Sequence, residues 1–457
     1  MLIVVSVLLG GGVVPPPPEY PAGNPANKGD GPGGRSDRSP RRTAVGQTRA
    51  MTVDVRTRVD GPTPEVDPAL LFGEQLPAAF ASSSEELRPA ATWLDPRPLT
   101  VEVDGDAWTL SVDDGRVGVT PGATSDQRLT LSRDALTDLV ADLVTPMAWF
   151  ISGALDSTAR LELLLDWWVL LRGALDGRTP YAPGAGSTPT FLDADGSPLD
   201  LGRSFRLDDD PDQMAHFLEE AGFVHIAGLF TEDEMAQISA DMDRAAPTYH
   251  QGDGRSWWAR THDGEDRLVR MQGFDEHSTT LTELLADRRF AGLGDLGRAG
   301  HRFGDFGPNR IEALVKPLGV VEGISDVPWH KDCANGRHSY DCCSMTVGVS
   351  ITGAGADSGQ LRVVAGSNRV LVWPAFVRKG QDLPLVDLPT GTGDVTIHLS
   401  CTTHMAQPPV ARERRVLYSA FNLPAQDAEA QRIGKAKLRE AREAAPVTVS
   451  QRPATAT

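Results

Sequence analysis

The stretch GDVTIHLSCTTHMAQPPVARERRVLYSAFN, residues 393–422, contains two short strand patterns on either side of a loop rich in Pro and Arg. Its apolar, β-branched and aromatic residues are bounded by Gly and Pro, as is typical of strands. Similar patterns precede it in RIEALVKPL (310–318), SMTVGVSIT (344–352) and GQLRVVAGS (359–367). Short strands separated by Gly/Pro turns predict an all-β core, either a sandwich or a jelly roll.

A candidate metal site lies beside these strands in VPWHKDC, residues 327–333. His330 and Asp332 are two residues apart, and residues at that spacing on a strand point to the same side. Non-haem Fe(II) is held by two imidazoles and one carboxylate with open positions opposite them. His404 is the candidate third ligand and His398 is its competitor. The alternative is that these are ordinary polar residues near the mouth of a barrel, because H-x-D alone occurs often by chance.

Basic residues on neighbouring strands can bind an acidic co-substrate. Arg414 and Arg415 face opposite sides of their strand, so only one of them can pair bidentately with a dicarboxylate inside the barrel. Lys316 lies on a strand predicted to face inward and can reach a co-substrate carboxylate, although a solvated or salt-bridged lysine is an equal alternative. Gln360 shares a strand face with Arg362, which makes it a candidate for the lining of the pocket.

Five motifs occur in one order along residues 205–424: AGFVHIAGLFTEDEM, VPWHKD, DSGQLRVVAGSNR, TGDVTIHLSCTTHMAQ and RRVLYSAFN. With them the chain resembles the phytanoyl-CoA dioxygenase family of Fe(II)/2-oxoglutarate oxygenases. The resemblance implies a double-stranded β-helix, or jelly roll, in which His330, Asp332 and His404 are the metal ligands. Arg414 best matches the family's 2-oxoglutarate arginine, with Arg415 left open.

The same resemblance implies a reaction. Fe(II), 2-oxoglutarate and O2 would hydroxylate an unactivated C–H of a small-molecule or lipid-like substrate, with release of succinate and CO2. Related halogenases lack the carboxylate, so Asp332 favours hydroxylation. Desaturation, epimerisation or ring formation remain alternatives within the family, and a non-catalytic ligand- or lipid-binding protein is the alternative outside it. Asn368 and Met405 replace the family's usual His and its Gly or Ser, which makes substrate specificity harder to transfer.

The N-terminal part of the chain predicts a smaller α+β domain. A helical pattern covers 66–92 and is expected to end near Pro89, after which two Asp-Gly pairs in 99–122 predict hairpins. Ser132 is a predicted N-cap, and LELLLDWWVLL (161–171) is apolar almost all round, which indicates a buried helix. This order of elements resembles the sterol-carrier-protein-like domain, whose members often enclose an apolar cavity for lipid or acyl groups.

The predicted fold class is therefore α+β and multidomain: a jelly roll with flanking helices, preceded by the smaller domain. We expect a disordered extension at 1–50, with Met51 as the natural start. The boundaries that follow are a sterol-carrier-like domain at 51–183, a linker at 184–204, the jelly roll at 205–424, and a charged helix with a disordered tail at 425–457.

Composition restricts the partners. The formal net charge of −18 disfavours nucleic acid, because phosphate contacts need clustered Lys and Arg. The apolar run near the N-terminus is far shorter than a membrane span, so no stable membrane insertion is expected. The four cysteines, Cys333, Cys342, Cys343 and Cys401, show no disulfide or zinc spacing and fit a cytoplasmic protein. The sequence does not specify an oligomeric state.

Overall fold

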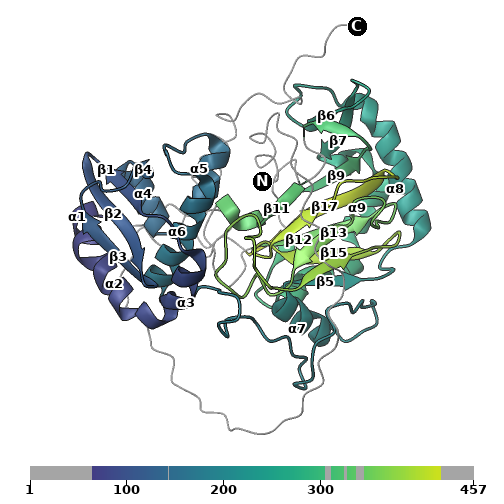
Figure 1. Cartoon of the computed structure of the whole chain (residues 1–457). Helices are drawn as coiled ribbons and strands as arrows, with labels where there is room; N and C mark the ends of the chain where they lie inside the picture. Colours follow the sequence, from purple (N-terminus) through teal and green to yellow (C-terminus); the bar gives the residue numbers. More distant parts are fainter. Residues whose placement is uncertain (1–63, 143, 304–309, 324–326, 336–343, 424–457) are drawn as a thin grey trace.

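The computed structural model describes residues 64–142, 144–303, 310–323, 327–335 and 344–423. The predicted extension at 1–50, the charged helix after 425, Cys342 and Cys343 lie outside these ranges. Figure 1 shows a smaller N-terminal unit beside a larger unit built around β-sheets. Among the described residues, no helix combines the length and the hydrophobicity needed to cross a membrane.

The N-terminal unit is a small sheet covered by helices. Its strand order is β3-β2-β1-β4, with β4 parallel to β1 and the other pairs antiparallel. The strands are β1 (Leu99–Val103), β2 (Asp106–Asp113), β3 (Arg116–Pro121) and β4 (Arg128–Leu131). The helices are α1 (Pro68–Leu70), η1 (Leu71–Gln75), α2 (Leu76–Ser82), α3 (Ser84–Leu94), α4 (Arg133–Val140), α5 (Pro146–Ser152) and α6 (Leu161–Asp176).

Local sequence explains most of these boundaries. Asp104-Gly105 and Asp114-Gly115 both have positive φ, as the predicted two-residue hairpin turns require. Ser132 accepts a hydrogen bond from the Ala135 amide and begins α4 as expected. The prediction that the first helical region ends near Pro89 is wrong, because α3 continues through Pro89 to Leu94. The apolar residues after Pro89 are buried in the core, and this tertiary packing outweighs the single backbone bond that proline removes.

The larger unit, which we call the β unit, contains two antiparallel sheets. The major sheet runs β10-β6-β7-β9-β17-β12-β15-β5, with β8 pairing with β17, and the minor sheet runs β11-β16-β13-β14. The major-sheet strands are β5 (Phe223–Ile226), β6 (Ser256–Thr261), β7 (Asp266–Gln272), β8 (Arg302–Phe303), β9 (Ile311–Lys316), β10 (Val320–Glu322), β12 (Ser344–Ser350), β15 (Val395–Leu399) and β17 (Arg414–Asn422). The minor-sheet strands are β11 (Val327–His330), β13 (Leu361–Val364), β14 (Leu385–Leu388) and β16 (His404–Ala406).

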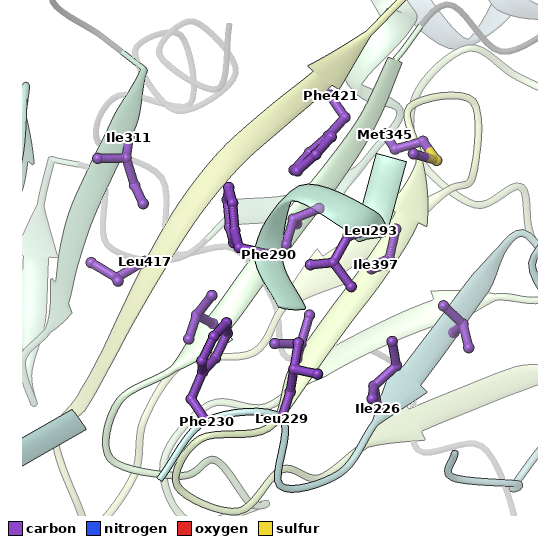
Figure 2. Packing of buried hydrophobic residues seen from close by; sticks show 14 of the residues in the cluster. Ile226, Leu229, Phe230, Phe290, Leu293, Ile311, Met345, Ile397, Leu417 and Phe421 are labelled. Atoms are coloured by element: carbon purple, nitrogen blue, oxygen red, sulfur yellow. The ribbon is translucent and has the colours of Figure 1, made fainter. Parts of the chain in front are cut away.

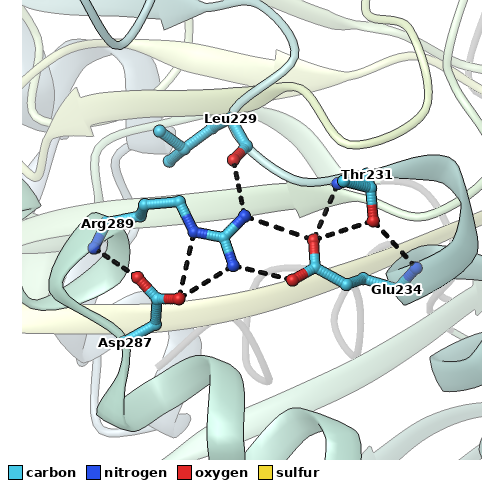
Figure 3. Close-up of polar contacts among 5 residues, drawn as sticks. All are labelled: Leu229, Thr231, Glu234, Asp287 and Arg289. Carbon is cyan, nitrogen blue, oxygen red and sulfur yellow. Dashed lines mark hydrogen bonds and ion pairs between the residues drawn. The ribbon is translucent and has the colours of Figure 1, made fainter.

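Helices cover the β unit at its edge and on one face of the major sheet. They are α7 (Pro211–Ala221), α8 (Glu232–Ala245), η2 (Ala246–Thr248), η3 (Phe274–His277), α9 (Thr279–Ala286), α10 (Arg288–Ala291), η4 (Gly292–Gly297) and η6 (Asp332–Asn335). α8 begins with a capping box, in which Thr231 and Glu234 bond each other's backbone amides. Figure 3 shows that Arg289 also pairs with this Glu234.

The two faces of the major sheet have different chemistry. Met345, Ile397, Leu417 and Phe421 point to the helix-covered face and pack there with Phe290, as Figure 2 shows. Their strand neighbours point to the other face, because side chains alternate along a strand. That face is more polar, and its members include Thr346, Thr396, His398, Arg414 and Tyr418. The alternation therefore gives one apolar core and one surface suited to a site.

Candidate metal and co-substrate site

The predicted ligand triad is brought together by the minor sheet. His330 on β11 lies directly opposite His404 on β16 in the antiparallel register. Asp332 follows His330 at the start of η6. One ligand atom from each of these three residues lies within 4.8 Å of the other two, and all three residues are buried. Strand pairing therefore places two remote stretches of sequence around one point, and His404 rather than His398 completes the group.

Backbone carbonyls orient both imidazoles of the triad. Nδ1 of His330 lies 2.7 Å from the Pro328 carbonyl oxygen, and Nδ1 of His404 lies 2.9 Å from the Thr402 carbonyl oxygen. Because a carbonyl only accepts, each Nδ1 carries the proton, and each Nε2 presents its lone pair to the site. The buried Nε2 of His330 makes no hydrogen bond within the described residues. This orphaned acceptor fits a metal ion, and a carbonyl behind a ligand histidine is the usual support for one.

The protonation states also suit metal binding. Burial lowers the pKa of His404 well below its usual range, and the neighbouring His398 and His330 act in the same direction. Burial alone would raise the pKa of Asp332, but His404, His330 and His398 outweigh it and hold this pKa well below the ordinary value. Metal ligands must be a neutral imidazole and an ionised carboxylate. His404 and Asp332 are therefore already in their metal-binding forms at neutral pH.

A cavity opens onto His330 and His404 of the triad and extends along the major sheet. Its polar lining includes His330, His404, Lys316 and Arg414, and its apolar lining includes Leu314, Leu361 and Val416. Trp257 on β6 also lines the cavity, with the guanidinium of Arg270 stacked over its ring at 4.2 Å from the centroid. The cavity thus combines a cationic region with apolar walls, as small-molecule sites commonly do.

The structure separates the two candidate arginines. Arg414 is buried and donates to the Gly359 carbonyl and to the Tyr418 hydroxyl, at 2.8 and 3.3 Å. Its Nε has no hydrogen-bond partner among the described residues. Arg415 lies on the opposite face, where it pairs with Asp243 of α8. Of these two arginines, Arg414 is therefore the one that offers an unsatisfied donor to an anion in the cavity.

The other two predicted residues differ in position. Lys316 lies opposite Arg414 in the strand register and lines the cavity, and its Nζ donates to the Ala406 and Gln407 carbonyls. Gln360 is buried but is not among the lining residues, because its side chain bonds Asp387 of β14. Arg362 pairs with the same carboxylate. The face that these two share is therefore turned to the neighbouring strand and away from the cavity.

Two residues that the sequence prediction did not name also belong to the site. Thr346 donates to Oδ2 of Asp332 at 2.7 Å, and Tyr418 accepts from Arg414. Thr346 follows from the alternation along SMTVGVSIT once the inward face is known. Tyr418 lies four residues after Arg414 on one strand face, so the same period locates it.

The comparisons with known proteins concern mainly this β unit. Residues 218–416 match the family model "Phytanoyl-CoA dioxygenase (PhyH)". The PhyH match covers less than half of the chain and includes His330, Asp332, His404 and Arg414. No curated protein matches the chain significantly.

Solved structures similar to the chain align with about half of it. AviO1 from Streptomyces viridochromogenes Tue57 is 18% identical, with 47% of this chain and 96% of AviO1 aligned at a TM-score of 0.38. The epimerase SnoN from nogalamycin biosynthesis, solved with Fe3+, alpha ketoglutarate and nogalamycin RO, is 20% identical, with 48% of this chain and 88% of that chain aligned at a TM-score of 0.37. EvdO2 from Micromonospora carbonacea var. aurantiaca, complexed with 2-oxoglutarate, is 20% identical over 48% of this chain and 93% of its own, with a TM-score of 0.35.

Proposed function

We propose that the β unit is an Fe(II)- and 2-oxoglutarate-dependent oxygenase that hydroxylates a small-molecule or lipid-like substrate. The observation that carries the proposal is the buried triad of His330, Asp332 and His404, whose two histidines line one cavity together with Arg414. Two imidazoles and one carboxylate are the ligand set of non-haem iron oxygenases. The PhyH family, whose model the segment matches, uses Fe(II), 2-oxoglutarate and O2.

Each residue has a defined task in this proposal. His330, Asp332 and His404 would hold Fe(II), and this metal with 2-oxoglutarate and O2 would supply the oxidant for a substrate C–H. The overall reaction takes the substrate, O2 and 2-oxoglutarate to the hydroxylated product, succinate and CO2. Arg414 pairs with the distal carboxylate of 2-oxoglutarate, and Tyr418 orients its guanidinium. Lys316 adds positive charge at the same end of the cavity.

The cavity walls support a substrate with an apolar portion. Val269, Leu314, Leu361 and Val416 line the cavity and exclude water from the reacting region. Trp257 offers a flat aromatic face beside them. We therefore favour a small substrate that places an aliphatic C–H between these walls and the triad.

A binding role for the N-terminal unit is a second part of the proposal. A cavity there is lined by apolar residues of η1, β1, α4 and α6, with Arg172 as a charged member. Arg172 is satisfied by Asp176 and by the Leu139 and Val140 carbonyls. An apolar group such as an acyl chain suits this lining. Binding of a fluorescent fatty acid to the full chain tests this role. Binding by a Leu164→Arg variant as tight as that by the wild type would contradict it.

The main test uses anaerobic Fe(II) and 2-oxoglutarate with the full chain. The proposal expects a weak visible charge-transfer band in the wild type and none in His330→Ala. His262→Ala is the matched control, because this histidine is exposed and does not line the cavity. A wild-type protein without the band and without 2-oxoglutarate-dependent succinate release would leave the ligand-binding alternative.

The reaction type is tested by a metabolite screen scored by succinate release. A product heavier by one oxygen atom supports hydroxylation. A product lighter by two hydrogens indicates desaturation or ring formation, and an unchanged mass with inverted configuration indicates epimerisation. Either of the last two outcomes would overturn the hydroxylase assignment and leave the metal and co-substrate assignments intact.

A further inference from the structure

A third imidazole stands beside the triad with no assigned task. His398 on β15 is only 1% exposed, and neither of its ring nitrogens has a hydrogen-bond partner among the described residues. Its ring packs against that of His404, with centroids 4.0 Å apart. An orphaned polar side chain at this depth is costly unless it acquires a partner when the site is filled.

The two oxygens of Asp332 face different groups. Oδ1 lies 3.4 Å from Nε2 of His330 and 3.9 Å from Nε2 of His404, so it faces the two ligand nitrogens. Oδ2 lies 3.4 Å from Nε2 of His398 and accepts the 2.7 Å hydrogen bond from Thr346. One oxygen therefore belongs to the metal side and the other to a supporting pair.

The supporting pair is built into the strand register. Thr346 on β12 and His398 on β15 are direct cross-strand partners, so their side chains lie side by side on the inward face. His398 faces Oδ2 and not the point at which the triad atoms converge, since the group of mutually close ligand atoms contains His404 and not His398. This geometry argues for a role that acts through Asp332 rather than for a fourth ligand.

We propose that His398 is a positioning residue that, together with Thr346, holds Oδ2 of Asp332 and leaves Oδ1 alone for the metal. This inference rests on the proposed function. The 3.4 Å separation is longer than an ordinary hydrogen bond, and bonds of this kind shorten when a site is loaded. A carboxylate held through one oxygen cannot bind the metal through both. The coordination positions needed by 2-oxoglutarate and O2 then stay open.

The test is metal affinity, measured anaerobically with Co(II) and the full chain in the absence of 2-oxoglutarate. His398→Leu removes the donor at similar volume, and His398→Gln keeps an amide N–H that can reach Oδ2. We expect Co(II) affinity to fall about 10- to 100-fold in His398→Leu, as for other groups that support metal ligands, and to recover in His398→Gln. Thr346→Val is expected to weaken binding to a similar degree, because it removes the other donor to the same oxygen.

The spectrum of bound Co(II) separates positioning from ligation. Because Thr346 still holds Oδ2 of Asp332 in His398→Leu, this variant at saturating Co(II) is expected to keep the wild-type ligand-field band positions. Bands that shift because a nitrogen ligand is lost would make His398 a ligand and overturn the inference, as would unchanged affinity in His398→Leu. If His398→Leu fails to fold by thermal unfolding, His398→Asn replaces it, since its shorter amide falls short of Oδ2. Failure of the wild type to bind Co(II) would instead count against the proposed function.

Discussion

Asp166 and Arg378 form a partly buried ion pair that joins the two units of the protein, with Nη1 of Arg378 2.7 Å from Oδ1 of Asp166. Asp166 lies on α6 of the N-terminal unit, and it also accepts a hydrogen bond from Nε1 of Trp373. The segment that carries Trp373 and Arg378 continues to the site, because Ala375 pairs with His330 and the Phe376 amide donates to the Trp329 carbonyl. The N-terminal unit therefore contacts the segment that supports a ligand strand.

This ion pair predicts a pH-dependent stability. Burial raises the pKa of Asp166 to about 6, although Arg378 and Trp373 oppose the shift. The folded-state pKa of Asp166 exceeds the unfolded value. The stabilising contribution of its protonated carboxyl to the free energy of unfolding is therefore fully present below about pH 4 and is lost as pH rises through about 6. The wild-type advantage over Asp166→Asn in free energy of unfolding should be larger at pH 5 than at pH 7.5, by about 1 kcal/mol.

Urea unfolding of both proteins at the two pH values measures this difference. Asp176→Asn is a control, since this carboxylate is on the same helix but pairs with Arg172 within the N-terminal unit. A wild-type advantage that is independent of pH, or that grows towards pH 7.5, would show that Asp166 does not carry the effect.

Replacement of the two arginines should have opposite outcomes. Arg414→Gln removes the buried guanidinium with the unsatisfied Nε, so we expect 2-oxoglutarate binding to weaken by about 10- to 100-fold. Arg415→Gln removes an outward ion pair with Asp243 and should change that affinity less than about twofold. Titration of the Fe(II)-dependent absorption band with 2-oxoglutarate measures both. Equal losses in the two variants would mean that the cavity is not the co-substrate site.

Gly348 is expected to be required at its position because a side chain there would collide with the Tyr418 ring. A Cβ at this position would lie 2.8 Å from Cε1 of Tyr418 and 3.1 Å from Oγ1 of Thr396. Gly348→Ala should displace the Tyr418 ring and its bond to Arg414, which weakens 2-oxoglutarate binding by about 3- to 10-fold on the usual scale of one hydrogen bond. Co(II) affinity should change little. Gly118→Ala on β3 is the control, because nothing lies near its Cβ position.

The capping box of α8 offers a test of stability away from the site. Thr231 caps the helix through the Glu234 amide, and Glu234 also pairs with Arg289, as Figure 3 shows. Thr231→Ala should lower the free energy of unfolding by about 1 kcal/mol. Thr231→Ser keeps the hydroxyl and should lie close to the wild type in the same denaturant titration. An alanine variant as stable as the serine variant would contradict the role of the cap.

Local patterns were sufficient for much of the fold. The Asp-Gly turns, the Ser132 cap and the strand segments from 310 to 422 depend on neighbouring residues, and the structure confirms them. The end of the first helical region at Pro89 was predicted wrongly, because burial of α3 after the proline is a tertiary effect. A resemblance in motif order, rather than periodicity, supplied the candidate ligands and the candidate arginine.

By itself, the sequence determined the alternation along each strand and therefore that Arg414 and Arg415 face opposite sides, because the side-chain period of a strand is two. It could not decide which side is inward, whether His398 or His404 joins His330 and Asp332, or that Gln360 turns to Asp387. Those answers depend on strand order and register, which are set by contacts between residues far apart in the chain. The tertiary structure alone pairs His404 with His330 and sets His398 beside Thr346, facing the other oxygen of Asp332.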